Sequence, residues 1–240
     1  MRGKANTGLI RFPVGLEEGP DGSAHVHSLT VPGCVASGRS KEAALEAFSR
    51  VLGQWLDFLA GQGEPVPPAD RELEITVDEW IATDARVASG ESDVCFDADR
   101  RPLVEPELLR GLRLLGGLRG RLLPHIRRAR DEDLEGLGPP EANVRRIVDE
   151  LARAQWWTLT RLGASPLAEV PARAVARLDT AMALIVQNMG ALTAEERARQ
   201  VEIEGEEWTA RKVLRRLLWL EWSLGTAALR TLADGKRELA

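Results

Sequence analysis

The sequence predicts an α+β protein of two domains: a small α/β domain with a short antiparallel sheet and one helix, followed by an all-α four-helix bundle. Two observations carry this prediction. Short segments of alternating polarity, separated by turn residues, fill the first third of the chain. Beyond residue 104, long apolar stripes recur at steps of three and four. We therefore assign residues 1–85 to the first domain, 86–104 to a polar linker and 105–240 to the bundle.

Composition sets the broad class of the protein. The chain has 240 residues, of which 44% are hydrophobic and 29% charged, as is usual for a globular protein. It contains neither an apolar run near the roughly 20 residues that span a bilayer nor a signal-peptide pattern. Cys34 and Cys95 lie far apart without a CxxC spacing, so we expect no disulfide framework and no zinc knot. The expected location is the cytoplasm, without membrane association.

Charge is distributed unevenly along the chain. Residues 1–85 carry 7 Lys and Arg against 13 Asp and Glu, whereas residues 86–240 carry 25 against 24. An acidic surface repels the phosphates of nucleic acids. We therefore do not expect nucleic acid as a partner.

The first domain is expected to begin with a hairpin. Residues 7–14 and 24–31 have the alternation of strands, and the segment between them is rich in Gly, Pro and Asp. Ser40 is a candidate N-cap for an amphipathic helix that ends near Gly61. Residues 73–77 then favour a further strand that returns to the sheet.

A PGC turn, a glycine, a helix that starts with an acid and alanine, and a Gly-Glu-Pro exit follow one another in this region; the residues are Pro32, Gly33, Cys34, Gly38, Glu42, Ala43, Gly63, Glu64, Pro65, Val66 and Pro67. With these residues the chain resembles, over residues 7–77, the antitoxin domain of the HicB family. The resemblance implies a partial ribonuclease H fold and no catalytic site, because family members act by binding a toxin or by placing an attached DNA-binding domain. No basic helix-turn-helix or ribbon-helix-helix candidate follows here, which is a departure from the DNA-binding members.

The second domain is predicted to contain four long helices, and its last helix defines the core. The helices are expected near residues 105–130, 143–162, 172–192 and 206–229, with a short helix or turn before the last one. In the last helix five apolar residues at steps of three and four are expected to face inward. They are Val213, Leu217, Leu220, Leu224 and Ala228.

The segment VRRIVDELARAQWWTLTRL from Val144 contains Trp156 and Trp157, and the segment EEWTARKVLRRLLWLEW from Glu206 contains Trp208. With these aromatic positions the bundle resembles, over residues 105–233, the DinB superfamily of metal-dependent four-helix bundles. Members hold a divalent metal through one His on the second helix and two on the fourth. Carried over to this chain, those positions fall on the residues Glu150, Leu220 and Leu224, while Glu221 keeps the acid that follows the first of the fourth-helix ligands.

A metal site is not expected at these degenerate positions. Glu150 could ligate a divalent cation, but leucine has no donor atom. We expect no metal, no cofactor and no catalytic residue. Glu150 itself has two possible settings: a core position paired with Arg211 or Arg146 or protonated, or the water-exposed edge of the bundle.

Other candidate residues favour structural roles. His25 and His27 are expected as an exposed or half-buried pair on one strand face, and Cys34 as a small buried residue. Tryptophans fill gaps between helices, but neighbouring ones cannot all face one core. Four of them therefore form a possible interface, either in a homodimer or in docking between the two domains, with another protein partner also possible. They are Trp156, Trp157, Trp219 and Trp222.

Together these patterns favour a non-enzymatic two-domain binding or assembly protein with a metal-free DinB-like bundle. One alternative is a metal-dependent, thiol transferase-like enzyme of DinB type with other ligands. Another is an antitoxin-like protein that neutralises a small basic toxin through residues 1–77.

Overall fold

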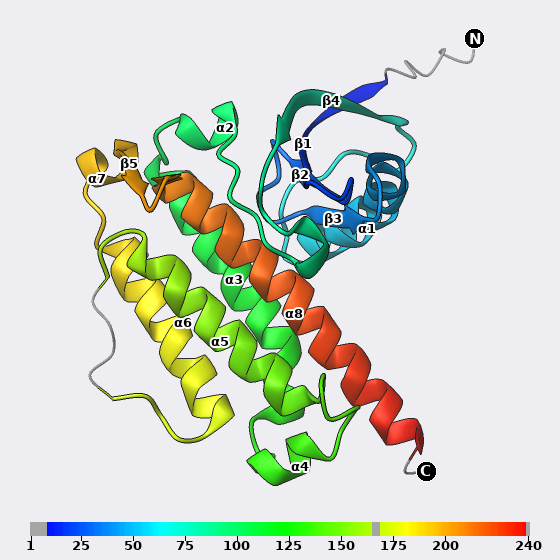
Figure 1. Cartoon of the computed structure of the whole chain (residues 1–240), viewed down its shortest axis with the longest axis vertical. Helices are drawn as coiled ribbons and strands as arrows, with labels where there is room; N and C mark the ends of the chain where they lie inside the picture. The colour runs from blue at the N-terminus through cyan, green and yellow to red at the C-terminus, as the bar shows by residue number, and fades with distance from the viewer. Residues whose placement is uncertain (1–8, 165–168, 239–240) are drawn as a thin grey trace. The chain divides into compact units, whose positions relative to one another are not determined.

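The computed structural model describes residues 9–164 and 169–238, and contacts within the chain divide it into two compact units. Unit 1 is Met1–Ala98 and unit 2 is Asp99–Ala240. Unit 1 contains a four-stranded sheet and unit 2 is mainly helical, so the α+β class is confirmed (Figure 1). None of the helices in the described ranges is long and apolar enough to cross a membrane.

The main sheet of unit 1 is mixed, which corrects the predicted antiparallel sheet. Its strand order is β3-β2-β1-β4; β1 pairs antiparallel with β2, β2 antiparallel with β3, and β4 parallel with β1. The parallel pair follows from the crossover through the helix α1, which returns the chain in the direction of β1. The strands are β1 Ile10–Glu18, β2 Ala24–Ser28, β3 Val35–Gly38 and β4 Leu73–Ala82.

Helix α1, Lys41–Gly61, packs on β2 and β3 and covers one face of the sheet. Ser40 caps it as predicted, because its hydroxyl accepts a hydrogen bond from the Ala43 amide at 3.2 Å. Strand β3, which the sequence did not predict, lies directly under the helix start. A Cβ at Gly38 would stand 2.3 Å from the Ala44 nitrogen, so only glycine permits this approach.

The opposite face of the sheet is covered by residues 83–96, most of which were expected as linker. This segment contains the 3-10 helix η1, Val87–Ser89, and the buried side chains of Val87 and Phe96. A Cβ added at Gly15 would stand only 2.4 Å from an atom of the Phe96 ring, which is too close for a side chain at this position. With both faces covered, every residue of β2 is buried.

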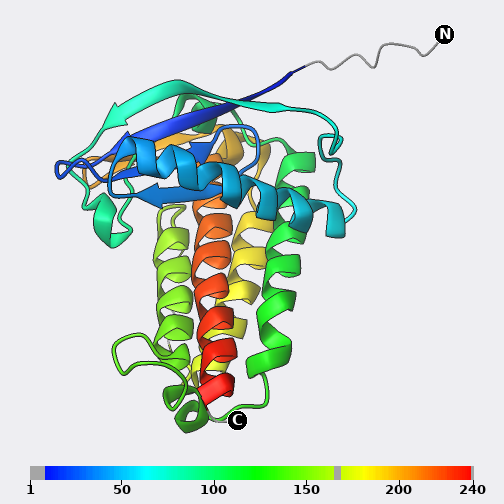
Figure 2. The same cartoon turned by 90° about the vertical axis from the view of Figure 1, so that its right-hand side faces the viewer.

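Unit 2 is built on four long helices that run side by side, α3, α5, α6 and α8 (Figures 1 and 2). Their apolar stripes meet in a core in which Leu122, Leu151, Leu178 and Ala228 are buried. Helix α4 lies within the predicted loop after residue 130, and Leu103 of the predicted linker is also buried. The helices are α2 Asp97–Arg100, which spans the division between the units, α3 Glu105–Ile126, α4 Asp131–Glu135, α5 Val144–Thr160, α6 Ala174–Gly190, α7 Ala194–Ala198 and α8 Ala210–Glu238.

The predicted start of the last helix at Glu206 is wrong, because a hairpin precedes it. Strand β5, Gln200–Ile203, pairs antiparallel with β6, Glu206–Thr209. The turn between them places Glu204 and Gly205 at φ values of 57° and 81°, a left-handed conformation that interrupts helix geometry. Helix α8 therefore begins at Ala210 and extends past Leu229 to Glu238.

The inward face of α8 is also shifted from the predicted stripe. Val213, Leu217 and Ala228 are buried as expected, whereas Leu220 and Leu224 are only partly buried and pack against the margin of the core. Because α8 turns by about 100° per residue, the residue next to Leu220 takes the fully inward position. That residue is Glu221.

Candidate functional site

The three positions to which the DinB-like resemblance would assign metal ligands lie along the α5 and α8 side of the bundle. Glu150 and Leu224 line the same pocket, while Leu220, one turn earlier on α8, packs against the core. The Glu150 carboxylate is 45% exposed and forms an ion pair with Arg153, one turn further along α5. Neither Arg211 nor Arg146 is its partner: Arg211 binds Glu107, and Arg146 donates to the Pro140 carbonyl.

These residues do not fit a divalent metal. Two of the three positions carry leucine, which offers no ligand atom, and the third carboxylate is already held by a guanidinium. Across residues 9–164 and 169–238 no group of three His, Cys, Asp or Glu is placed to hold a metal ion. No chemical step can therefore be assigned to a metal at this point of the bundle.

The centre of the bundle instead contains a buried ionic network that joins all four long helices. Arg119 of α3 donates to both carboxylate oxygens of Glu221 of α8, with two distances of 2.8 Å. The same guanidinium donates to the Gln155 side-chain oxygen of α5 at 2.9 Å and to the Leu178 carbonyl of α6 at 2.6 Å. Gln155 in turn donates to Glu221 at 2.6 Å.

The members of this network satisfy one another's charges and hydrogen bonds. Arg119, Gln155 and Glu221 are all buried, and a buried charge is tolerated only where a partner and hydrogen bonds compensate its lost hydration. The bidentate guanidinium–carboxylate geometry provides that compensation. The network therefore fixes how the four helices pack, and it presents no reactive group to solvent.

Sequence reasoning missed Arg119 and Gln155, although a signal was present. Each polar member lies four residues after a buried leucine on its own helix, so it continues an apolar stripe. The pairs are Leu115 with Arg119, Leu151 with Gln155, and Leu217 with Glu221. A polar residue in such a stripe on three separate helices indicates a buried network.

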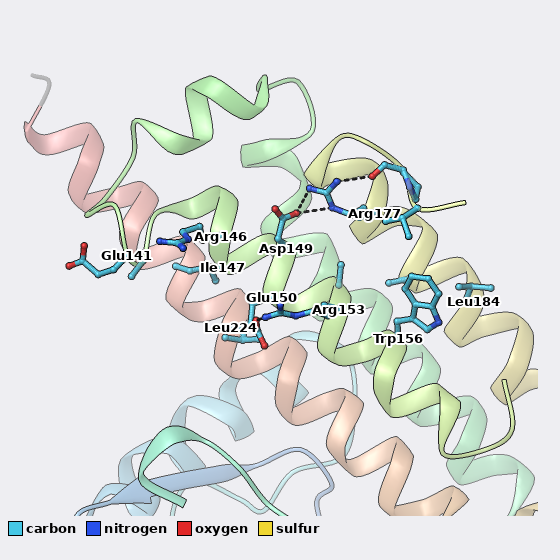
Figure 3. A pocket seen from close by; sticks show the side chains of 15 residues that line it. Glu141, Arg146, Ile147, Asp149, Glu150, Arg153, Trp156, Arg177, Leu184 and Leu224 are labelled. Atoms are coloured by element: carbon cyan, nitrogen blue, oxygen red, sulfur yellow. Dashed lines mark hydrogen bonds and ion pairs between the residues drawn. The ribbon is translucent and has the colours of Figure 1, made fainter. Parts of the chain in front are cut away.

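The pocket that contains Glu150 and Leu224 has a volume of about 930 Å³ and follows α5 on its α6 and α8 sides. Figure 3 shows Glu150, Arg153 and Leu224 together on the α8 side, and Trp156 facing Leu184 on the α6 side. Much of its wall is apolar, and small residues widen it where α5 and α6 pack. The apolar residues are Ala142, Ile147, Ala152, Trp156, Val170, Pro171, Ala181, Leu184 and Leu224.

Two of the carboxylates that line the pocket are paired with arginines of the bundle. Asp149 accepts two hydrogen bonds from Arg177, at 2.9 and 2.6 Å, and Glu150 pairs with Arg153. Arg177 also donates to the carbonyls of Pro171 and Ala172 at 2.7 and 2.5 Å, which fixes the chain entering α6. The pocket therefore combines an apolar wall with a charged rim, in which Asp149 and Glu150 are paired and Arg146 donates to the Pro140 carbonyl.

The four tryptophans predicted as an interface lie in different settings. Trp156 lines the pocket, whereas Trp157 points elsewhere, is 37% exposed and meets the Trp208 ring edge-on at 5.6 Å. Trp219 and Trp222 are buried, and the Arg121 guanidinium lies 5.3 Å from the Trp222 ring. The interface stays a prediction, and Trp156 and Trp157 are its accessible members.

Unit 1 contains a second buried ionic cluster, which corrects the expectation for its histidines. His25 and His27 are both buried, and the Glu17 carboxylate lies 3.0 Å from His27 Nε2. The other Glu17 oxygen accepts a hydrogen bond from the Asp93 amide at 3.2 Å. Sequence reasoning placed this strand face near solvent because it did not foresee the covering segment.

The Glu17 carboxylate is held ionised by this surrounding. Burial alone would raise its pKa, but hydrogen bonds from His27 and Ser92 and the charges of His27 and His25 lower the pKa of Glu17 to about 2. The cluster thereby fastens the covering segment to the sheet. Burial also raises the pKa of the Cys34 thiol, which is consistent with the small buried residue that was predicted.

Comparisons of the chain with protein-family models, with curated proteins and with solved structures found no match. The HicB-like and DinB-like resemblances therefore rest on the sequence motifs alone.

Proposed function

We propose that this chain is a cytoplasmic, non-catalytic two-domain binding or assembly protein, in which a DinB-like bundle serves as a scaffold without a metal. The observation that carries the proposal is the pocket along α5. There, a DinB-type ligand set is replaced by leucine and by a carboxylate already paired with Arg153. Packing and ion pairing take the place of coordination in this bundle.

The chemistry of the pocket favours a ligand with substantial apolar surface. Its wall offers Ile147, Trp156 and Leu184, whereas two of its carboxylates, Asp149 and Glu150, are already paired with arginines. Ligand sites in proteins are concave, mostly apolar and of a few hundred Å³ or more. A neutral or amphipathic molecule, or an apolar side-chain group of a partner, matches this setting better than a free ion.

The metal-free part of the proposal is tested by elemental analysis of purified full-length protein after dialysis against zinc, nickel or manganese. We expect no stoichiometric metal in the wild type and no difference in Glu150→Ala. One equivalent of metal that the Glu150→Ala variant loses would overturn the proposal in favour of a metal-dependent enzyme.

The binding part is tested with Nile red, a neutral apolar dye. We expect saturable dye fluorescence that Trp156→Ala weakens, because this change removes a wall of the pocket. Trp157→Ala is the matched control, since the neighbouring ring lies against Trp208 and outside the pocket lining. Equal dye binding by both variants and the wild type would exclude the pocket as the site.

A further inference from the structure

Strand β4 is exposed to an extent that sets it apart from the rest of its sheet. It is the longest strand, with ten residues, and none of them is buried, whereas all five residues of β2 are buried. Its apolar side chains include Val77 at 45% and Trp80 at 61% exposure. A strand of this length therefore contributes little to the core of unit 1.

The position of β4 in the sheet leaves one of its sides open. Within residues 9–164 and 169–238, the strand order β3-β2-β1-β4 places it at one edge of the sheet, where it pairs with β1 alone. Figure 2 shows β4 running beside β1 along this edge. Backbone N–H and C=O groups along an open edge are a template for pairing with another strand.

The edge carries a strong negative charge that selects among possible strands. Residues 72–84 contain five Asp and Glu and no Lys or Arg. Natural sheet edges discourage pairing with charged side chains, above all lysine, and with proline or bulges. Strand β4 has one irregularity of register, opposite Val14 and Gly15, and its own charges are acidic, so they disfavour an acidic strand and favour a basic one; Arg11 of β1 pairs with one of them, Asp78.

Trp80 supplies an additional contact for a cation. The Lys41 ammonium lies 5.2 Å from the centre of its ring, so the face of this exposed indole already accepts a positive group. A lysine or arginine of an incoming strand could bind the same ring.

We propose that the free edge of β4 is a docking site for an extended, basic segment of a partner protein, which adds to the sheet as a further strand. Main-chain hydrogen bonds provide the pairing, Glu72 and Glu74 attract the basic side chains, and Trp80 stacks with one of them. This site lies in unit 1 and does not depend on the pocket in unit 2. A second copy of the chain fits less well, because it would bring its own five carboxylates to the same edge.

The proposal is tested with the full-length protein and fluorescein-labelled eight-residue peptides, by fluorescence anisotropy. The probe alternates Lys and Val. Its two comparison peptides are the Glu–Val analogue and a Lys–Val peptide with N-methylated amides at alternate positions, which cannot form the edge ladder. We expect binding of the Lys–Val peptide alone, weakened by salt.

The variant Glu72→Lys/Glu74→Lys should weaken that binding by about tenfold or more. The matched control is Glu46→Lys/Asp57→Lys, which makes the same charge change at exposed positions of α1. Circular dichroism checks that both variants fold. Equal loss in both variants, or equal binding of the N-methylated peptide, would overturn strand addition in favour of nonspecific attraction. A wild-type dimer in sedimentation that Trp80→Ala dissociates would overturn it in favour of a second copy.

Discussion

Each unit of this protein buries a carboxylate, but the two carboxylates have different partners. In unit 1, Glu17 meets the imidazole of His27 and fastens one covering segment to a sheet. In unit 2, Glu221 meets the guanidinium of Arg119 and ties four helices together. The comparison predicts that unit 2 depends on its buried pair globally, because the pair joins four helices, and that unit 1 depends on its pair locally, at one covering segment.

The largest effect is expected from Glu221→Ala in the bundle. It would leave the Arg119 guanidinium buried without its carboxylate, which costs about 3–5 kcal/mol of unfolding free energy in comparable sites. Urea unfolding followed by far-ultraviolet circular dichroism measures the loss, because the bundle dominates the helical signal.

A double variant separates the uncompensated charge from lost packing. Arg119→Met/Glu221→Leu removes both charges and should recover much of the stability lost in Glu221→Ala, since apolar groups replace many buried pairs at little cost. A loss below about 1 kcal/mol in Glu221→Ala, the range of an exposed pair, would show that the network does not hold the bundle.

Acid should weaken the attachment of residues 83–96 to the sheet of unit 1, because it protonates Glu17. Its pKa is lowered to about 2 in the folded protein, below the usual value near 4.5, so its contribution is complete above about pH 5 and is lost as the pH falls towards 2. The shift corresponds to about 3 kcal/mol. Hydrogen exchange of residues 83–96, measured by mass spectrometry, should rise over this range after correction for the intrinsic rate.

Glu17→Gln is the control for this pH effect. The variant keeps the shape of the side chain but has no carboxylate to protonate, so protection of residues 83–96 should be lower at pH 6 and change little between pH 5 and 2. The groups that surround this position are His25, His27, Ser92 and Asp93. An unchanged pH response in the variant would assign the effect to another group.

One glycine in each unit allows the two units to be compared by the space that each leaves beside its backbone. A Cβ at Gly38 would press on the Ala44 backbone nitrogen at 2.3 Å, whereas one at Gly111 in α3 would meet only the end of the Leu214 side chain at 2.6 Å. We expect Gly38→Ala to cost about 1–3 kcal/mol by overpacking. Gly111→Ala should cost less, because leucine can move and alanine favours the helix. Thermal unfolding of the two variants under identical conditions measures the difference, and a larger loss in Gly111→Ala would contradict it.

Periodicity was enough to predict the long helices but not the polar centre of either unit. Leu115, Leu151 and Leu217 mark their stripes clearly, because apolar burial follows the helical repeat. Arg119 and Gln155 were missed because a single polar residue in a stripe has no partner in the sequence, and only the fold brings Arg119 into contact with Glu221, 102 positions away. The short strands β3 and β6 were missed for a related reason. Whether these strands form depends more on their pairing partners and neighbouring turns than on their own four residues.

The smallest effect on the unfolding free energy is expected from a substitution of Glu150, an exposed carboxylate that contrasts with the buried Glu221. This carboxylate belongs to the same bundle as Glu221, but it is 45% exposed and its partner Arg153 is 76% exposed. Water already solvates both groups, so Glu150→Ala should change the unfolding free energy by less than about 1 kcal/mol. Urea unfolding of Glu150→Ala beside Glu221→Ala measures the contrast directly. A loss in Glu150→Ala as large as that in Glu221→Ala would place Glu150 in the interior, and burial would no longer explain the difference between the two carboxylates.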